Sequence, residues 1–394
     1  MVFIPYGRQS ISEEDLQAVA DVLRSDYLTQ GPEVPKFERA IADYCGAAHA
    51  VAVNSATSGL HIACLALGLG EGDVAWTVPN TFVASANCAI YCGASVDFVD
   101  IDPVTLNMSA RRLEEKLKIA KAEGYVPKVV IPVHFSGLPC DMAKIGALAQ
   151  EYGFHVIEDA SHAIGASYGN GKVGNCQHSD ITIFSFHPVK IITTAEGGLA
   201  TTQSAELARR MQDLRSHGIT RDAARMAKPN EGAWHYEQLD LGFNYRMTEM
   251  QAALGSSQAT RLDEWVARRH AIADAYDKKL AHLPLILPVR ESGSFSALHL
   301  YVVQVDETKT SLTRRQLFDA MRKAEIGVNV HYIPVHTQPY YRENGMAGVS
   351  FPASEAYYSR CVSLPMFASL SDEDQARVIA VLEHIFTVPE HSLA

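Results

Sequence analysis

The sequence predicts an α/β protein: a large domain built on a mostly parallel β-sheet, followed by a smaller C-terminal α+β domain. Three apolar runs in the first half are typical of buried strands, at residues 129–135, 154–157 and 181–186. A helical pattern at 142–151 separates the first two runs. Alternating strands and helices indicate right-handed βαβ crossovers and a parallel sheet. Because ligands of such sheets bind beyond the carboxyl ends of the strands, we look for functional residues there.

The pattern changes near residue 250. Apolar residues from Leu254 to Leu280 fall largely at helical spacing, which predicts one long connecting helix. Strand-like runs follow at 299–305 and 327–336. These features are typical of a smaller α+β unit.

Two capping signals place helices in that unit. Thr313, with Gln316 three residues later, is expected to cap a helix. Ser371, followed by acidic residues, is expected to open the last helix. We therefore expect a large domain over residues 1–255 and a small domain over residues 256–394.

Composition narrows the class of protein. Of the 394 residues, 47% are hydrophobic and 20% are charged, as in folded globular proteins. Lys and Arg total 34 against 45 Asp and Glu, so the net charge is −11. This balance argues against nucleic acid as a partner, because a phosphate backbone requires a basic surface. No apolar run approaches the roughly 20 residues of a membrane helix, so we expect no membrane partner.

The first residues and the cysteines bear on location and metal content. The opening residues lack the pattern of a secretory signal. The seven cysteines are odd in number, and no second pair or nearby histidines complete a zinc site with Cys88 and Cys92. We expect reduced, mostly buried thiols, a cytoplasmic protein and no metal site.

A run of small residues, 54–59, lies between the apolar residues 50–53 and a helical pattern. At a strand-to-helix turn such residues leave backbone N–H groups free, and the helix dipole adds positive potential, so the turn suits a phosphate group. The alternative is simple N-capping of the helix by Ser or Thr.

The run 156–162 ends a predicted strand with Glu158 and Asp159, followed by His162. A carboxylate at the carboxyl end of the strand could pair with a cationic ring nitrogen and keep it protonated. The alternative is a helix N-cap beside a solvated acid.

Lys190 follows a predicted buried strand within the run 185–190, and a Thr- and Gly-rich stretch comes after it. Burial at this place would lower the pKa of an amine, and a neutral amine forms a Schiff base with a carbonyl compound. The alternative is an ordinary surface lysine.

The run 242–246 contains Asn244 and Arg246 beside aromatic residues. These side chains could bind an anion or another subunit, or the run could be a loop packed on the core. Taken together, a phosphate-binding turn, a carboxylate and a strand-end lysine are the three groups that pyridoxal phosphate (PLP) requires.

With these groups in place, the sequence resembles the DegT/DnrJ/StrS-type sugar-nucleotide aminotransferases over nearly its whole length. The densest motif is SFHPVK with TAEGG, at 185–190 and 194–198, and further matches are NSATSGL, VPNTFVASAN, EDASHAIGA and LGFNYRMTEMQAALG. The YLTQGP, LRSHGI and VHYIPV runs are most similar to those of the C4 aminotransferases of pseudaminic acid biosynthesis.

The resemblance implies an aspartate-aminotransferase-like fold (fold type I) and a role for each matching residue. Lys190 would form the Schiff base with PLP, Asp159 would face the pyridine nitrogen and His162 would position the cofactor. Phe82 would lie against the ring, Ala56, Thr57 and Ser185 would hold the phosphate, and Asn244 would reach the phosphate site of the neighbouring subunit of a homodimer. Substrate contacts would come from Tyr6, from Asp26, Tyr27, Leu28 and Thr29, and, across the dimer, from Tyr332, Ile333 and Pro334.

The implied activity is transfer of an amino group from L-glutamate, through the pyridoxamine phosphate form, to C4 of a UDP-linked 4-keto-6-deoxy-N-acetylhexosamine. Three alternatives stay open: a C4 or C3 aminotransferase for another nucleotide-linked keto sugar, a PLP-dependent sugar dehydratase, and an inactive PLP-binding regulator. Related 3,4-dehydratases replace the Schiff-base lysine with histidine, so Lys190 favours transamination.

Overall fold

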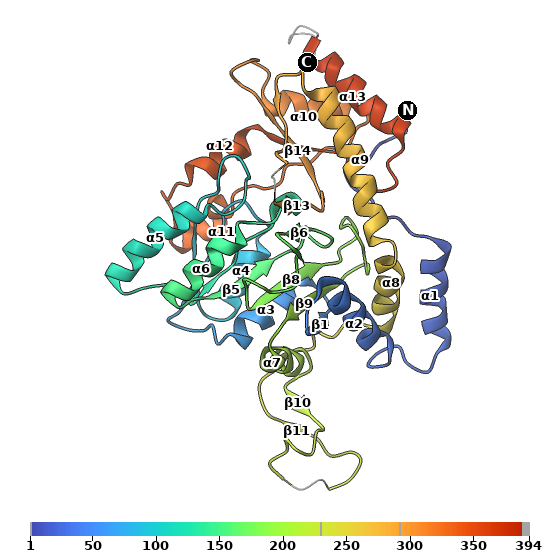
Figure 1. Ribbon diagram of the computed structural model, residues 1–394, viewed down its shortest axis with the longest axis vertical. Helices are drawn as coiled ribbons and strands as arrows, with labels where there is room; N and C mark the ends of the chain where they lie inside the picture. The colour runs from blue at the N-terminus through green and yellow to red at the C-terminus, as the bar shows by residue number, and fades with distance from the viewer. Residues whose placement is uncertain (1, 229–230, 291–292, 388–394) are drawn as a thin grey trace.

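The structure is a computed structural model that describes residues 2–228, 231–290 and 293–387. Within these residues it has the predicted architecture, a large α/β domain with a smaller domain above it in Figure 1. The seven strands of the central sheet are, in spatial order, β1 (His49–Val53), β9 (Gly198–Thr202), β8 (Ile181–Ser185), β5 (His155–Asp159), β4 (Val129–Val130), β2 (Val74–Thr77) and β3 (Ser95–Phe98). The sheet is mostly parallel, since only β9 runs antiparallel to its neighbours.

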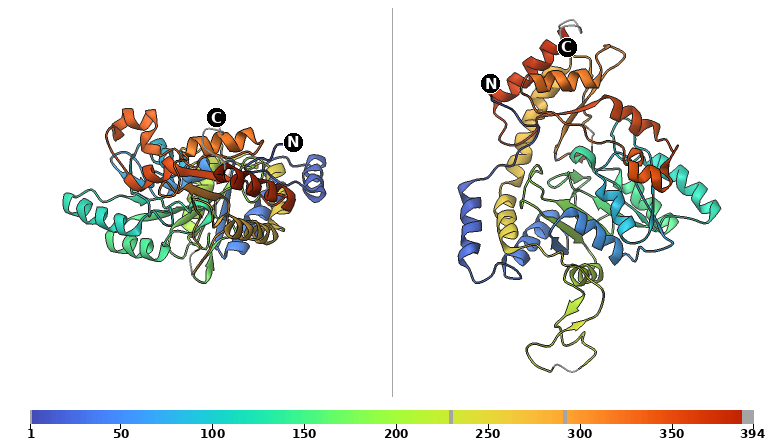
Figure 2. Two further views of the ribbon diagram at one scale, coloured as in Figure 1. Left: turned by 90° about the horizontal axis from the view of Figure 1, so that it is seen from above. Right: turned by 180° about the vertical axis from the view of Figure 1, so that it is seen from behind.

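Helices cover both faces of this sheet, as the two views of Figure 2 show. They are α2 (Glu33–Cys45), α3 (Ala56–Ala66), α4 (Ala84–Tyr91), α5 (Ala110–Glu123), α6 (Met142–Tyr152), α7 (Ala205–Arg215) and α8 (Glu249–Ala259), whereas α1 (Glu13–Arg24) packs on α8. Alternate strand residues serve the two faces: Val51 and Val53 of β1 pack with α3, α4 and α7, whereas Ala50 and Ala52 pack with α2. The sheet is therefore buried on both sides, as expected of parallel strands.

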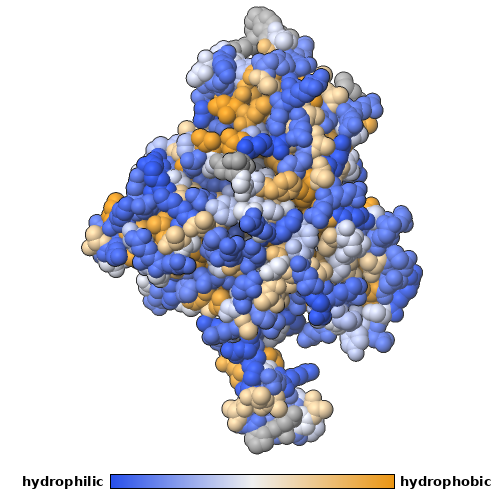
Figure 3. Space-filling view, in the orientation of Figure 1, coloured by the Kyte–Doolittle hydropathy of each residue, from blue (hydrophilic) through white to orange (hydrophobic). Residues whose placement is uncertain are grey.

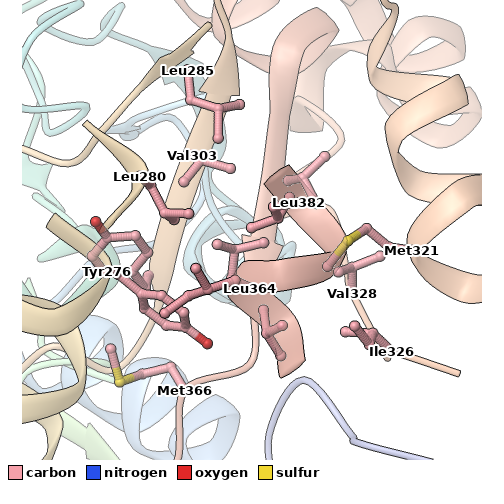
Figure 4. Packing of buried hydrophobic residues seen from close by; sticks show 14 of the residues in the cluster. Tyr276, Leu280, Leu285, Val303, Met321, Ile326, Val328, Leu364, Met366 and Leu382 are labelled. Atoms are coloured by element: carbon pink, nitrogen blue, oxygen red, sulfur yellow. The ribbon is translucent and has the colours of Figure 1, made fainter. Parts of the chain in front are cut away.

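The small domain packs helices on a three-stranded sheet. Its elements are α9 (Leu262–Leu280), β12 (Leu285–Ile286), β14 (Tyr301–Val305), α10 (Arg314–Lys323), α12 (Pro352–Arg360), β15 (Cys361–Leu364) and α13 (Asp372–Thr387). Figure 4 shows its core, in which Tyr276 of α9, Val303 of β14 and Leu364 of β15 lie together. Ile4 belongs to the same cluster and bridges to Ile326, so the amino-terminal segment completes the C-terminal domain.

Short elements connect these parts. A three-stranded sheet joins β13 (Ser294–Phe295), β6 (Ser167–Tyr168) and β7 (Gly171–Lys172), and single helical turns follow at η1 (Phe135–Gly137), η2 (Val335–Thr337), α11 (Pro339–Tyr341) and η3 (Arg342–Met346). Among the described residues, none of the helices combines the length and apolar character needed to cross a bilayer.

Both predicted capping signals of the small domain are confirmed. Thr313 and Gln316 form a reciprocal capping box at the start of α10. The Ser371 hydroxyl accepts a hydrogen bond from the Asp374 amide at the start of α13, and acidic residues fill its first turn.

Three predicted elements differ in the structure. The run 129–135 forms a strand only at β4, because Pro132 has no N–H to donate and the chain then turns into η1. The predicted long helix is two helices, because the chain breaks at Arg261, whose guanidinium instead reaches Asp15 of α1 (Nη2 to Oδ1, 2.6 Å). The run 327–336 is extended but pairs only at single bridges, one of them between Asn329 and Ser363.

The helix α9 belongs to both domains. Its first residues, Leu262, Trp265 and Val266, pack in the large-domain core, and its later residues pack in the small-domain core. The boundary after residue 255 stays a prediction.

Residues 216–228 and 231–242, here called the arm, project from the body of the molecule in both Figure 1 and Figure 2. The arm contains the two-stranded pair of β10 (Ile219–Thr220) and β11 (Glu237–Gln238). Trp234 and Leu241 of the arm are 73% and 76% exposed, and Figure 3 shows apolar residues gathered there among polar ones. Such exposed apolar surface is typical of a contact with another chain.

Candidate functional site

A cavity of about 560 Å³ lies at the carboxyl ends of β5 and β8, where a ligand of a parallel sheet is expected. The turn before α3, the loops after β5 and β8, and the small-domain segment 329–332 all contribute to its wall. Nine of the residues expected from the sequence line it: Tyr6, Ala56, Thr57, Phe82, Asp159, His162, Ser185, Lys190 and Tyr332.

The turn before α3 fits both roles considered for the run 54–59, the capping of a helix and the binding of a phosphate group. Ser55 caps the helix, because its hydroxyl accepts from the Ser58 amide (3.1 Å). Ala56 and Thr57 belong to the first helical turn, whose amides have no carbonyl partner inside the helix, and both line the cavity. Together with the Ser185 hydroxyl at the end of β8, these amides form a seat for a phosphate group.

Asp159, the last residue of β5, is buried and faces the cavity. Its Oδ2 accepts a hydrogen bond from the Ser85 hydroxyl of α4 (2.6 Å), and its Oδ1 accepts from the Ser161 amide (3.1 Å). The hydroxyl of Ser85 also lies 2.8 Å from that of Thr81. The carboxylate is therefore fixed in position rather than solvated.

Glu158, the other acid of the motif, points to the opposite face of the sheet. It is buried and contacts His134 Nε2 (2.6 Å) and the Thr182 hydroxyl (3.0 Å). No helix follows Asp159 directly, so the alternative of an N-cap beside a solvated acid is wrong for this pair.

Lys190 lies in the loop after β8, on the wall of the cavity, and is half-buried. Burial lowers the pKa of its amine to about 8, although the nearby Asp159 carboxylate acts in the opposite direction. A substantial fraction of this amine is thus neutral near pH 8, as a nucleophile requires.

His162 connects the two domains at the cavity. Its Nδ1 accepts from the Ser136 amide (3.3 Å), which leaves the proton of the neutral ring on Nε2, 3.0 Å from the Tyr332 hydroxyl. Burial, and then the charge of Lys190, hold the pKa of His162 well below its usual value. The ring is therefore neutral and acts as a positioning group.

The expected action of Tyr332 across the dimer stays a prediction, and Tyr332 itself lies in the cavity of its own chain. The reason is that Asn329 bridges to Ser363 in the same small domain, which places the segment over its own sheet. Phe82 lies opposite, with its ring centre 6.3 Å from that of Tyr332.

Seven other expected residues do not line this cavity: Asp26, Tyr27, Leu28, Thr29, Asn244, Ile333 and Pro334. The loop 26–29 and Asn244 are exposed. Glu249, which follows Asn244 by five residues in sequence, is bonded to the loop side: its amide donates to the Leu28 carbonyl (3.0 Å), and its Oε2 accepts from the Glu33 amide (2.6 Å). Ile333 is exposed and Pro334 is buried beside it.

Three histidines that line the cavity are not among the expected site residues: His187, His299 and His331. His331 bonds to the Ser363 hydroxyl (2.7 Å), and burial lowers its pKa to about 3. His299 is buried, lines the cavity and packs on His162, with ring centres 4.4 Å apart. The only sequence signal for His299 is its place at the start of the run 299–305, and that pattern predicts a strand and no site residue.

The cysteines and potential metal ligands complete the description of the site. All seven cysteines are unpaired, and all but Cys92 are buried. Within the ranges that the structure describes, no group of three or more His, Cys, Asp or Glu side chains is arranged to hold a metal ion.

Comparison with protein families gives one match that spans most of the chain. The model of the DegT/DnrJ/EryC1/StrS aminotransferase family matches residues 9–383. Among curated relatives, the spore coat polysaccharide biosynthesis protein SpsC of Bacillus subtilis is 41% identical over 386 residues, which are 97% of each chain.

Solved structures agree with this match. PseC of Helicobacter pylori, an aminotransferase involved in the biosynthesis of pseudoaminic acid, superposes with a TM-score of 0.88 at 28% identity, over 98% of this chain and 99% of that one. The PLP-form of Spr1654 from Streptococcus pneumoniae gives a TM-score of 0.87 at 28% identity over both whole chains. These neighbours have the fold type I architecture expected from the sequence.

Proposed function

Because the chain belongs to the DegT/DnrJ/EryC1/StrS family of PLP-dependent sugar aminotransferases, we propose that it transfers the amino group of L-glutamate to C4 of a UDP-linked keto sugar. The proposed acceptor is UDP-2-acetamido-2,6-dideoxy-β-L-arabino-hexos-4-ulose, an intermediate of pseudaminic acid biosynthesis. One observation carries the catalytic part of the proposal: a single cavity holds the Lys190 amine, the Asp159 carboxylate and the amides of Ala56 and Thr57.

The chemistry of this donor set fits PLP. The first-turn amides of α3 and the Ser185 hydroxyl suit the phosphate, and Asp159 suits a protonated ring nitrogen. Gly198 supports the turn, because a Cβ there would lie 2.5 Å from the Ala56 nitrogen, so only glycine lets β9 pack so closely. When bound, PLP supplies an aldehyde that condenses with amines and a ring that takes up the electrons of the broken C–H bond.

The residues of the chain then hold the reacting groups in position and transfer protons. Asp159, held by Ser85 and Ser161, presents its negative charge in a fixed direction and needs no reorganisation. Lys190 binds the proton at Nζ when charged and releases it when neutral, and its pKa of about 8 suits both directions near neutral pH. The neutral His162 holds the Tyr332 hydroxyl at the wall of the cavity.

The choice of sugar rests on two kinds of support. The structural likeness to PseC and the YLTQGP and VHYIPV runs favour the pseudaminic acid intermediate. The higher sequence identity to SpsC supports, as a second candidate, a C4 or C3 aminotransferase for another nucleotide-linked keto sugar. Lys190 in the cavity argues against both a dehydratase and an inactive regulator.

We also propose a homodimer with shared active sites, located in the cytoplasm. Asn244 and the loop 26–29 match substrate and cofactor contacts of the family but lie outside the cavity of their own chain. Glu249, which is bonded to Leu28, follows Asn244 by five residues in sequence, so a partner would supply both segments together. The unpaired state of the cysteines supports a reducing compartment.

The proposal is tested by mixing purified protein with L-glutamate and 4-keto sugar nucleotides and identifying the product by NMR. We expect a UDP sugar that carries a new amine at C4. The NMR couplings then give the configuration at this carbon. Lys190→Ala should abolish turnover, whereas Lys172→Ala, a surface lysine beside Tyr44, should not. An active Lys190→Ala variant, or loss of the amine from the product, would overturn the assignment.

Shared active sites are tested by complementation between two inactive variants. Lys190→Ala and Asn244→Ala are each expected to be inactive, since each lacks one part of every site. Mixing the two by denaturation and refolding should restore about a quarter of the sites if Asn244 acts in the partner's site. If each variant alone is inactive, a refolded mixture that also stays inactive would show that Asn244 acts within its own chain.

A further inference from the structure

Arg269 of α9 is a buried cation with an unusual set of partners. Its side chain is 1% exposed, and its Nη1 donates to the carbonyl oxygens of Leu298 (3.2 Å), His299 (3.1 Å) and Met366 (3.1 Å). Among the residues that the structure describes, no carboxylate forms an ion pair with it. Burial of an unpaired guanidinium is costly, so the hydrogen bonds to these carbonyls must matter to the fold or to the site.

The first pair of carbonyls fixes a strained segment of the cavity wall. Leu298 has a φ of 50°, a conformation that a branched side chain adopts only when the surroundings enforce it. The segment is pressed against Gly137, where a Cβ would lie 2.8 Å from the Leu298 nitrogen. Arg269 holds the other side of the segment, and the His299 ring thereby packs on His162.

The third carbonyl connects Arg269 to a second part of the wall. The amide of Met366 donates to the Tyr6 carbonyl (3.0 Å), so the residue that bonds to Arg269 through its oxygen holds Tyr6 through its nitrogen. Tyr6 lines the cavity and is one of the expected substrate contacts. One guanidinium thus spans two wall segments that are nearly 300 residues apart in sequence.

We propose that Arg269 is a positioning residue that sets the two wall segments containing His299 and Tyr6, and through His299 the ring of His162. It touches neither cofactor nor substrate and acts only through these carbonyls. Burial holds the pKa of His299 well below its usual value, and the nearby charges of Lys190 and Arg269 act in the same direction. His299 therefore packs as a neutral ring against the neutral His162.

Arg268 provides a matched control on the same helix. Its guanidinium also binds a backbone carbonyl of the small domain, that of Leu370 (2.6 Å), and Asp372 (2.7 Å), but neither partner lines the cavity. Replacing Arg268 by Met removes an arginine of equal size and charge. It leaves the segments 297–300 and Tyr6 tied to Arg269.

The test measures amide hydrogen exchange in the cofactor-free protein, which does not depend on the proposed reaction. In Arg269→Met we expect roughly tenfold faster exchange at 297–300 and at Met366, as the loss of hydrogen bonds to a charged donor implies. Arg268→Met should leave exchange at these amides within about twofold of the unsubstituted protein. Unchanged exchange in a folded Arg269→Met variant would overturn the proposal.

If Arg269→Met does not fold, the same exchange measurement is made on Arg269→Lys. It keeps the charge, but its amine lies about one bond short of the position of Nη1, which makes all three bonds, so it cannot reach both segments as arginine does. We expect faster exchange in at least one of them, and unchanged exchange in both would contradict the proposal.

Kinetics then ask whether this positioning matters for transamination, a step that rests on the proposed function. The Arg269 variants should raise KM for the keto sugar by roughly fivefold or more at saturating PLP, whereas Arg268→Met should not. A purely structural role would lower Tm in both series and leave KM unchanged. Inactivity of all proteins, including the unsubstituted one, would count against the proposed substrate and not against the exchange result.

Discussion

The hydroxyl of Ser85 donates a 2.6 Å hydrogen bond to Oδ2 of Asp159, from a helix to the end of the neighbouring strand. Because Ser85 lies in α4 and Asp159 ends β5, the carboxylate is oriented by a part of the chain 74 residues away. This bond fixes the direction in which the negative charge faces the cavity.

Removal of this bond should weaken catalysis without loss of fold. For Ser85→Ala we expect kcat/KM to fall roughly tenfold, since a hydrogen bond to a charged group contributes about 1.5–3 kcal/mol. The matched control is Ser161→Ala, because Ser161 bonds Asp159 only through its backbone amide, which alanine keeps. Equal activity of the two variants would show that Ser85 does not orient Asp159.

The pKa of Lys190 predicts a pH dependence for uptake of PLP by the cofactor-free protein. Its amine has a lowered pKa of about 8, so the reactive neutral form increases with pH up to that value and is nearly complete above it. The rate of Schiff-base formation, followed by absorbance, should rise about tenfold per unit below pH 8 and level off above it. A rate that keeps rising to pH 10 would mean that burial does not lower this pKa.

The same lowered pKa affects the stability of the cofactor-free protein. Between about pH 8 and the ordinary lysine value of 10.5, the unfolded chain binds more protons at this residue than the folded one. The contribution of Lys190 to the free energy of unfolding is therefore unfavourable at pH 7 and is removed as the pH rises through this window. Lys190→Met should raise Tm at pH 7, and the gain should shrink at pH 10.

Gly198 should not tolerate a side chain. A Cβ at this position would lie 2.5 Å from the Ala56 nitrogen and 2.6 Å from the Ser55 carbonyl carbon, both of them backbone atoms that cannot yield locally. Gly198→Ala should lower the free energy of unfolding by roughly 1–3 kcal/mol and weaken PLP binding, as overpacking at the phosphate turn implies. Gly7→Ala is the control, because its Cβ would make only an ordinary 3.6 Å contact with Val189.

Glu249 should govern the order of the loop that precedes α2. Glu249→Ala removes the acceptor of the Glu33 amide, and we expect faster hydrogen exchange at Glu33 and a loss of roughly 1–2 kcal/mol. Glu249→Gln keeps an oxygen that can accept the same bond, so it should retain most of the protection. If the two variants behave alike, the charge of Glu249 matters and the hydrogen bond does not.

The sequence predicted the parallel sheet and the central site because their signals are local. Asp159 and Lys190 each follow an apolar run, and the ends of parallel strands meet at one edge, so their proximity follows from strand order. The capping box of Thr313 could be predicted for the same reason, since it needs only residues three apart.

The features that were missed depend on contacts distant in sequence. The break at Arg261 reflects its bond to Asp15, and no pattern within α8 or α9 encodes that partner. The place of Tyr332 in its own cavity depends on the bridge of Asn329 to Ser363, and His299 reaches the wall only because α9 holds its carbonyl. Tertiary contacts of this kind are invisible to periodicity.

The position of Ile4 has a consequence for how the chain matures. Its amide donates to the Glu325 carbonyl (3.0 Å) and its carbonyl accepts from the Gly327 amide (2.6 Å), within a core otherwise built from residues 272–385. Because Ile4 packs with residues that are synthesised much later, the small domain stays open until the chain has been made as far as residue 385. Replacing Ile4 by a polar residue would therefore destabilise the small domain, although the two lie far apart in sequence.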